Sequence, residues 1–262
     1  MLEVTDMSRK KSFTTVLCSL LALLSLPVVS LAAVSCQTTP SLINITLGYH
    51  GVPVEIRGDS APGDEVIVKI STAPADAHLK YKGKAGGIFW MKLGTLIFKN
   101  IPGTYLLSAS ASLDKALSPA AREQNNIGYE ALQKKVSIEA EKGDLPKGDW
   151  FKQFIEFKEH EKVYAISEDN VKVEANGGYK LDLKWPFQAQ PGEYTVEVIT
   201  AKNGQVTGTA QSSITVEMTG FVAKISNLAS NHRAMYGIIA IVVALAVGFA
   251  VGNIFKKGGG AH

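Results

Sequence analysis

Cysteine is scarce in this chain: the 262 residues include two, Cys18 and Cys36. Cys18 lies in a segment that we expect to be removed, and the single cysteine that remains cannot form an internal disulfide. An exported domain of this sequence must therefore be held together by its hydrophobic core alone.

Catalytic patterns are missing as well. The sequence has no phosphate-binding glycine loop, no G-x-S-x-G nucleophile motif and no C-x-x-C pair. Glu156 and His160 share one face of a predicted helix, with Glu159 and Glu161 nearby. These side chains indicate either a metal site or a solvated, charged helix face, and the second pattern is far commoner. We therefore predict a non-catalytic protein with no cofactor-binding and no metal-binding residues.

A strong net charge is also absent, since the formal value is +3. The adjacent basic residues at the two ends, Arg9–Lys11 and Lys256–Lys257, flank apolar runs. Membrane targeting explains this placement better than nucleic-acid binding, so we expect no nucleic-acid partner.

Residues 1–35 have the order of a secretory signal peptide: a basic start, an apolar run over residues 13–33 and small residues at the exit. Cleavage after Ala32 or after Ser35 satisfies the small-x-small rule. An uncleaved signal anchor is the alternative, but Pro27 and the small exit residues argue against it. Cys36 follows a partial lipobox, Ala33-Val34-Ser35, in which Ala33 replaces the usual branched residue, so lipidation of Cys36 is a further hypothesis.

Residues 236–255 form an uncharged, mostly apolar run of about 20 residues, long enough at about 1.5 Å per residue to cross a bilayer. Tyr236 and Phe255 mark its interfacial ends. The lysine pair in the tail, residues 256–262, is expected to stay in the cytoplasm. We therefore predict a single-pass protein of the inner membrane, with the preceding domain outside, in the periplasm, and residues 219–235 as a juxtamembrane segment.

Small residues recur every four positions along the predicted span, at Ala240, Ala244, Gly248 and Gly252. This spacing places them on one helix face, where another helix can approach closely. Either the stripe packs against a membrane partner, or it reflects the general abundance of Ala and Gly in such helices.

The sequence pattern of the exported part predicts a mainly β fold. Residues 36–115 and 163–218 contain short apolar or alternating runs separated by turn signals such as Pro62-Gly63, Pro102-Gly103 and Asn203-Gly204. We expect strands at 43–47, 54–57, 65–70, 78–82, 88–93, 95–98, 104–110, 171–174, 179–185, 193–200 and 205–216. Residues 116–162 are predicted to be a helical insertion, with helices starting near Ser118 and Asp149. The fold class is an immunoglobulin-like sandwich, or two fused β modules, with this insertion and one C-terminal transmembrane helix.

Two further features carry competing interpretations. Lys80, Lys82 and Lys84 alternate along a predicted strand, so they either face an anion or lipid headgroups, or form a solvated strand face. Trp90 and Trp185 are either core residues or platforms for a ligand, and we expect them in the core, because large aromatic side chains dominate burial in small sandwiches.

Several short stretches resemble an uncharacterised family of transmembrane proteins first described from alphaproteobacteria. They are Val54–Gly58, Val66–Val68, Gly87–Trp90, Phe98–Pro102 with Tyr105, Pro191–Tyr194 and the closing run from Gly220 to the final helix. The resemblance implies a signal peptide, a β-rich exported part and one C-terminal span. It also implies a gene neighbourhood with a sulfite-exporter-like permease, and it supplies no functional residues. His50 and Gly51 depart from the family pattern.

Two functions remain open from the sequence. The first is an accessory subunit of an integral membrane complex or transporter, with the bilayer and an integral membrane protein as partners. The second is a periplasmic domain that senses or binds a small anion.

Overall fold

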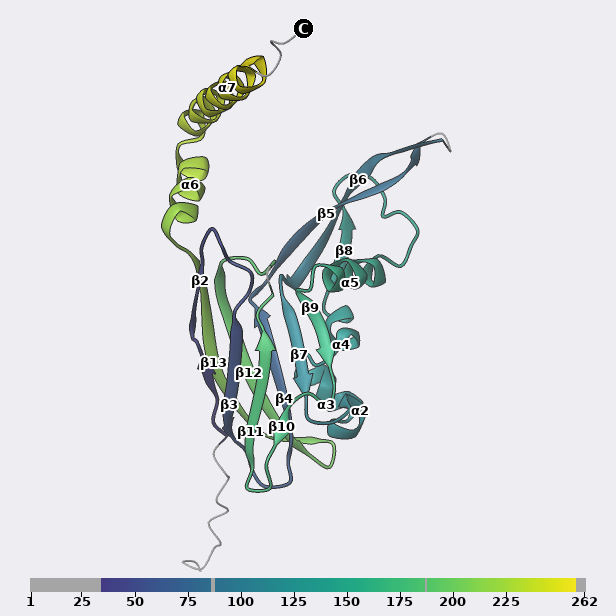
Figure 1. Cartoon of the computed structure of the whole chain (residues 1–262). Coiled ribbons are helices and arrows are strands. Elements are labelled where there is room, and N and C mark those ends of the chain that lie inside the picture. Colours follow the sequence, from purple (N-terminus) through teal and green to yellow (C-terminus); the bar gives the residue numbers. More distant parts are fainter. Residues whose placement is uncertain (1–33, 86–87, 187, 258–262) are drawn as a thin grey trace, which may run out of the picture. The chain divides into compact units, whose positions relative to one another are not determined.

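The structure is a computed structural model that describes residues 34–85, 88–186 and 188–257. Residues 1–33 of the predicted signal peptide, Gly86, Gly87, residue 187 and residues 258–262 of the tail lie outside the described residues. The strands are β1 (Gln37–Thr39), β2 (Leu42–Ile45), β3 (Pro53–Asp59), β4 (Glu65–Thr72), β5 (Pro74–Ala85), β6 (Phe89–Pro102), β7 (Tyr105–Ala109), β8 (Ser137–Ala140), β9 (Tyr164–Ser167), β10 (Lys172–Val173), β11 (Gly178–Lys184), β12 (Gly192–Lys202) and β13 (Gln205–Met218) (Figure 1).

The strands form three sheets. A four-stranded sheet has the order β1-β3-β11-β10, a six-stranded sheet the order β2-β13-β12-β4-β7-β9, and a smaller sheet the order β5-β6-β8. Strands from the first and second predicted β parts pair directly, β3 with β11 and β4 with β12. The mainly β prediction is confirmed, and the two β parts share the two larger sheets instead of forming separate modules.

The six-stranded sheet is covered on both faces. Val66 and Val68 of β4 belong to the core that this sheet shares with the four-stranded sheet. Ile67 between them belongs to a second core, formed with the helices and the base of the β5–β6 hairpin. Strands buried on both faces have continuous apolar runs instead of alternation, which explains Val66–Val68 and the similar run in β12.

The predicted insertion contains three short helices and one strand, and a fourth short helix ends at its first residue. The helices are α2 (Leu113–Ala116), α3 (Pro119–Gln124), α4 (Tyr129–Gln133) and α5 (Trp150–His160), and the strand is β8. Ser118 and Asp149 are helix caps as predicted, since their side chains accept hydrogen bonds from the backbone of Ala121 and Lys152. The helix that starts at Ser118 ends at Gln124 and α4 begins at Tyr129, because Asn126 and Gly128 between them have φ values of +53° and +90° that helical residues avoid.

Some observed strands differ from the predicted ones in their length or were not predicted. The separate strands expected at 88–93 and 95–98 are parts of the single strand β6, which pairs along its length with β5. β1, β8 and β9 were not predicted. The Asn203-Gly204 hairpin is confirmed between β12 and β13, where both residues have positive φ.

Two helices end the described chain. α6 (Gly220–Asn231) is separated from β13 by Thr219 alone, and α7 (Arg233–Lys257) follows it. α7 contains the predicted span, and residues Arg233–Asn253 are long and apolar enough to cross a membrane. It is the single helix with this property in residues 34–85, 88–186 and 188–257.

Candidate membrane-facing surfaces

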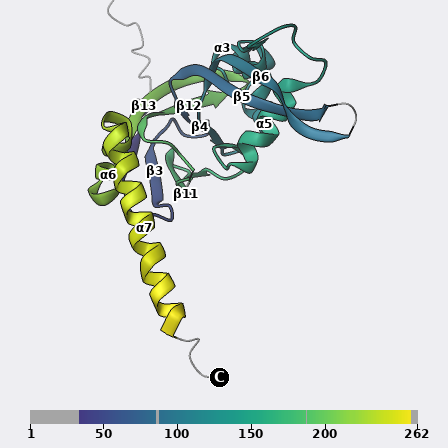
Figure 2. The ribbon, with the colours of Figure 1, turned by 90° about the horizontal axis from the view of Figure 1, so that it is seen from above.

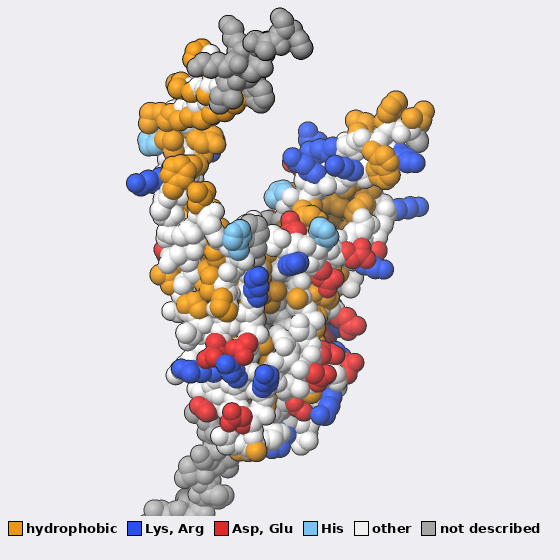
Figure 3. All heavy atoms as spheres, in the orientation of Figure 1, with side chains coloured by type: hydrophobic (Ala, Val, Ile, Leu, Met, Phe, Trp, Pro, Cys, Tyr) orange, Lys and Arg blue, Asp and Glu red, His pale blue; other side chains and the backbone are white. Residues whose placement is uncertain are grey.

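α7 presents apolar side chains on every side. Its large residues are exposed around the whole circumference, with Leu245 at 70% and Phe249 at 76%, and Figure 3 shows hydrophobic side chains covering this helix. An apolar helix with no buried face in a folded domain is typical of a membrane span. α7 therefore anchors the protein in a membrane.

The stripe of small residues lies on an open face of α7. Ala240, Ala244, Gly248 and Gly252 are all exposed. A methyl group built on either glycine meets no heavy atom within 4 Å. This face accordingly has room for the close approach of a second helix, which is the geometry that such stripes serve when they pack.

The three alternating lysines lie on β5 of a long hairpin. Lys80, Lys82 and Lys84 are exposed. Lys82 is opposite Lys92 in the β5–β6 register, and Lys84 is opposite Trp90, with its Nζ 5.8 Å from the centre of the indole ring. The structure therefore brings the predicted lysines together with a fourth lysine and an aromatic ring.

The core prediction for the two tryptophans is half right. Trp185 is 1% exposed and packs edge-on against Tyr194, with ring centres 4.9 Å apart. Trp90 is 70% exposed near the end of the hairpin, so its core assignment is wrong. The reason is that β6 extends beyond the part of the domain that covers it.

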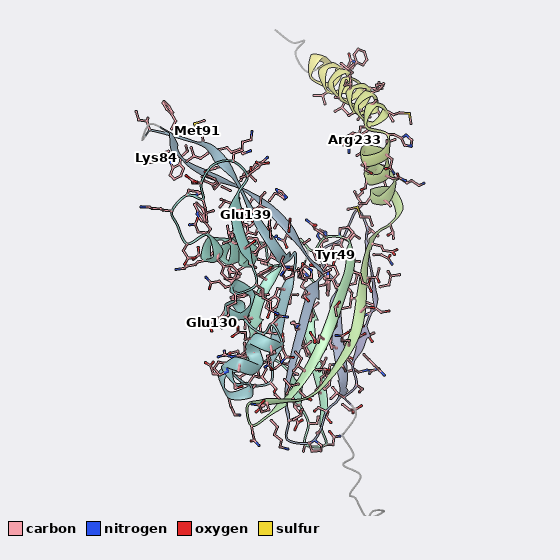
Figure 4. The ribbon with its side chains drawn as sticks, turned by 180° about the vertical axis from the view of Figure 1, so that it is seen from behind. Tyr49, Lys84, Met91, Glu130, Glu139 and Arg233 are labelled. Atoms are coloured by element: carbon pink, nitrogen blue, oxygen red, sulfur yellow. The ribbon has the colours of Figure 1, made fainter. Side chains whose placement is uncertain are left out.

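Sequence reasoning missed the apolar residues around Trp90. Ile88, Phe89, Met91 and Leu93 are all large and exposed. Figure 3 shows hydrophobic side chains gathered at the end of the hairpin with lysines beside them, and Figure 4 places Lys84 and Met91 there. A signal existed in the sequence: the chain has no Asp or Glu between Asp76 and Asp114, although the lysines and the apolar run lie in this interval.

The acidic face of α5 is engaged in local contacts. Glu156 lies 4.0 Å from Lys152, Glu161 lies 3.4 Å from Lys158, and Glu159 accepts a hydrogen bond from the Tyr129 hydroxyl. In the described part of the chain, no group of three or more His, Cys, Asp or Glu residues could hold a metal ion. These contacts favour the charged-face interpretation of α5.

A cavity of about 510 Å³ is lined by residues of β7, of β9 and of the C-terminal end of β11. Its lining includes His50, Lys162 and Lys184, together with Ser167, Asn170 and Trp185, and includes no Asp or Glu. Among the described residues, the buried Trp185 Nε1 has no hydrogen-bond partner. The cavity thus combines basic groups with polar donors, a set that suits an anion. His50, noted from the sequence as a departure from the family pattern, is part of it.

These features define a membrane-anchored protein with a mainly β domain and one C-terminal span. The chain belongs to the family described as "Putative transmembrane protein (Alph_Pro_TM)", whose model matches residues 33–257. The resemblance noted from the sequence is therefore confirmed. A comparison with curated proteins finds no match. A comparison with solved structures finds none either.

Proposed function

We propose that this protein is a non-catalytic accessory subunit of an integral membrane complex. In this proposal α7 packs against a membrane partner in the inner membrane, and the β domain is held outside the cytoplasm. The partner is a transporter, and the family resemblance points to a sulfite-exporter-like permease. The observation that carries the proposal is that α7 is apolar around its whole surface and leaves the Gly248–Gly252 face open.

The connection between the sheet and the span supports a positioning role. Thr219 separates β13 from α6, and its backbone amide donates a hydrogen bond to the Ile45 carbonyl, 3.0 Å away. His232 separates α6 from α7, and the Tyr236 amide donates to its carbonyl. A partner that fixes α7 thereby limits where the β domain can lie, because the link consists of one 12-residue helix.

The helix contact is tested with Gly248→Leu combined with Gly252→Leu. Leucine keeps the span apolar and helical but prevents close backbone approach, so co-purification of the membrane partner should be lost while insertion is unchanged. The matched control is Val242→Leu with Ala246→Leu, which adds bulk on roughly the opposite face. Equal retention of the partner by both double variants would remove this face from the proposal. Equal loss would assign the contact to the helix in general.

The orientation is tested with reporters fused after His262. A reporter that works only outside the cytoplasm should be silent there, and a cytoplasmic reporter should be active, because Lys256 and Lys257 favour retention of this end inside. The reverse pattern would overturn the proposed periplasmic location of the β domain.

The cavity lined by His50, Lys162 and Lys184 favours a second candidate, the binding or sensing of a small anion. Calorimetric titration of the full chain in detergent with sulfate should show binding that Lys184→Gln weakens and that the exposed Lys142→Gln leaves unchanged. Absence of heat with sulfate, and with a small dicarboxylate as a second probe, would eliminate this candidate.

A further inference from the structure

We propose that the end of the β5–β6 hairpin is a second membrane contact, which inserts into the bilayer interface and binds anionic headgroups on the side of the β domain. The residues that carry this contact are Phe89, Met91 and Leu93 on one face, and Trp90 with its neighbouring lysines on the other. The inference is independent of the proposed partner of α7, because its ligand is the lipid itself.

The hairpin has two chemically different faces beyond a β-bulge. The register shifts between Tyr81 and Lys82, where Tyr81 is opposite Gly94 and Lys82 is opposite Lys92. Because side chains alternate along a strand, one face beyond this point has Lys82, Lys84, Lys92 and Trp90. The other face has Phe89, Met91 and Leu93, with Leu93 lying over Gly83. The hairpin end is therefore amphipathic.

The apolar face is buried at the base of the hairpin and uncovered at its end. Leu79 and Tyr81 pack against the core that includes Phe154 of α5, and the Tyr81 and Trp150 rings lie 5.4 Å apart. Figures 1 and 2 show α5 beside the lower part of the hairpin. Beyond α5 the same side of the ribbon continues with Leu93 at 49%, Met91 at 51% and Phe89 at 72% exposure. Contiguous apolar exposure of this kind marks an interaction surface.

The charges around this surface favour an anionic lipid interface. Residues 77–98 contain Lys80, Lys82, Lys84 and Lys92 and no Asp or Glu. Lysine stems cover apolar surface while their ammonium groups reach phosphates, and tryptophan prefers the level of the headgroups. Lys84 and Trp90 are neighbours, so both interfacial residue types occupy the same point of the hairpin.

The sheet topology starts the hairpin and the membrane-helix segment at the same end of the strands. β4 and β13 both pair antiparallel with β12, so they run in the same direction, and Thr72 and Ile214 are both opposite Tyr194. The hairpin starts two residues after β4 ends, and α6 starts two residues after β13 ends. The hairpin and the membrane-helix segment therefore leave from the same end of the sheet, where β4 and β13 both terminate.

The hairpin is also long enough to reach the interface. α6 has 12 residues and, at about 1.5 Å per residue, separates this end of the sheet from α7 by at most about 18 Å. β5 also has 12 residues but, at about 3.3 Å per residue, spans about 40 Å. The end of the hairpin can accordingly touch the membrane that α7 crosses.

Quenching of tryptophan fluorescence by brominated lipid tests the insertion. The full chain is reconstituted into vesicles of phosphatidylglycerol and phosphatidylcholine at a ratio of about 1:3, with and without bromine on the acyl chains. The chain has three tryptophans, and we expect the brominated vesicles to remove most of the Trp90 emission. Trp90→Phe should abolish this quenching, whereas Trp150→Phe, at the base of the hairpin, should preserve it. Equal fractional quenching of the wild type and Trp90→Phe would overturn the proposal.

The headgroup contact has its own test in the same vesicles. Lys82→Glu with Lys84→Glu should reduce the quenching of Trp90, and so should replacement of phosphatidylglycerol by phosphatidylcholine. The matched control, Lys142→Glu with Lys147→Glu, makes the same charge change at exposed positions outside the hairpin. If the hairpin variant and the control quench equally, lysine recognition of anionic lipid is wrong. The vesicles contain no other protein, so a contact made only with a protein partner would appear as no quenching of Trp90 and would also overturn the proposal.

Discussion

Tyr179 donates a hydrogen bond from its hydroxyl to the backbone carbonyl oxygen of Ser35, 2.5 Å away across 144 residues of sequence. The Ser35 amide donates to the Asp59 carbonyl at 3.0 Å, and the Asp59 amide donates to the Ser35 hydroxyl at 2.9 Å. Val34 and Cys36 pack against the core between the two larger sheets. The segment just before β1 is therefore part of the folded domain.

This relationship predicts the site of signal cleavage. Both Ala32 and Ser35 precede acceptable cleavage sites, but cleavage after Ser35 would remove the carbonyl that Tyr179 binds, at a cost of about 1 kcal/mol for each lost hydrogen bond. We expect cleavage after Ala32, so that the mature chain begins at Ala33. Intact-mass analysis of the protein purified from membranes checks this. A mature chain that begins at Cys36 and carries a lipid mass would contradict it and would establish the lipobox hypothesis instead.

The two tryptophans of the original core assignment should differ sharply in their effect on stability. Trp185→Ala removes a ring that is 1% exposed and should lower the free energy of unfolding by about 3–5 kcal/mol. Trp90→Ala changes a ring that is 70% exposed and should alter it by no more than about 0.5 kcal/mol. Denaturant unfolding of the full chain in detergent, followed by circular dichroism, measures both. A large loss for Trp90→Ala would show that the hairpin end is packed.

The ion pair between Lys69 and Glu197 joins the central strands β4 and β12. The Lys69 Nζ lies 2.5 Å from Glu197 Oε2 and also donates to the Asn125 carbonyl at 2.9 Å. Glu197→Ala leaves the buried ammonium group with one partner and should cost about 2 kcal/mol in the free energy of unfolding. Lys69→Met combined with Glu197→Leu should recover most of that loss, because no buried charge remains. Additive losses in the double variant would contradict this account.

Glu65 should make the stability depend on pH in the acidic range. The Ser110 hydroxyl, 2.6 Å away, and then the Lys115 ammonium lower the pKa of the Glu65 carboxyl. A lowered folded-state pKa contributes stability above the unfolded value of about 4.3, and this contribution is lost as the pH falls through the folded-state value. The free energy of unfolding should therefore fall between about pH 5 and 3, and Glu65→Gln should show a smaller fall. Glu193→Gln, at an exposed position on β12, is the control, and identical slopes for all three proteins would exclude Glu65 as a contributor.

Local signals in the sequence determined the parts of this fold that need no distant contact. The apolar run over residues 236–255 predicted the span, because its length and lack of charge suffice for a helix in lipid. Asn203-Gly204 predicted a hairpin, and Ser118 and Asp149 predicted helix starts, because caps and tight turns depend on a few adjacent residues. The alternating runs predicted a mainly β domain for the same reason.

Only the tertiary structure decided which apolar residues are covered. Trp90 and Trp185 both lie in or beside strand-like runs, yet β11 ends inside the core and β6 extends past α5. Burial depends on how far a strand continues beyond its neighbours, and local pattern does not contain that information. The departure of the hairpin and of the membrane helix from the same end of the sheet likewise follows from the pairing of β4 and β13 with β12, strands that are far apart in sequence. The sequence thus determined that the protein is membrane-anchored. The pairing of distant strands decided that the hairpin with the second apolar surface starts at the same end of the sheet as the membrane-helix segment.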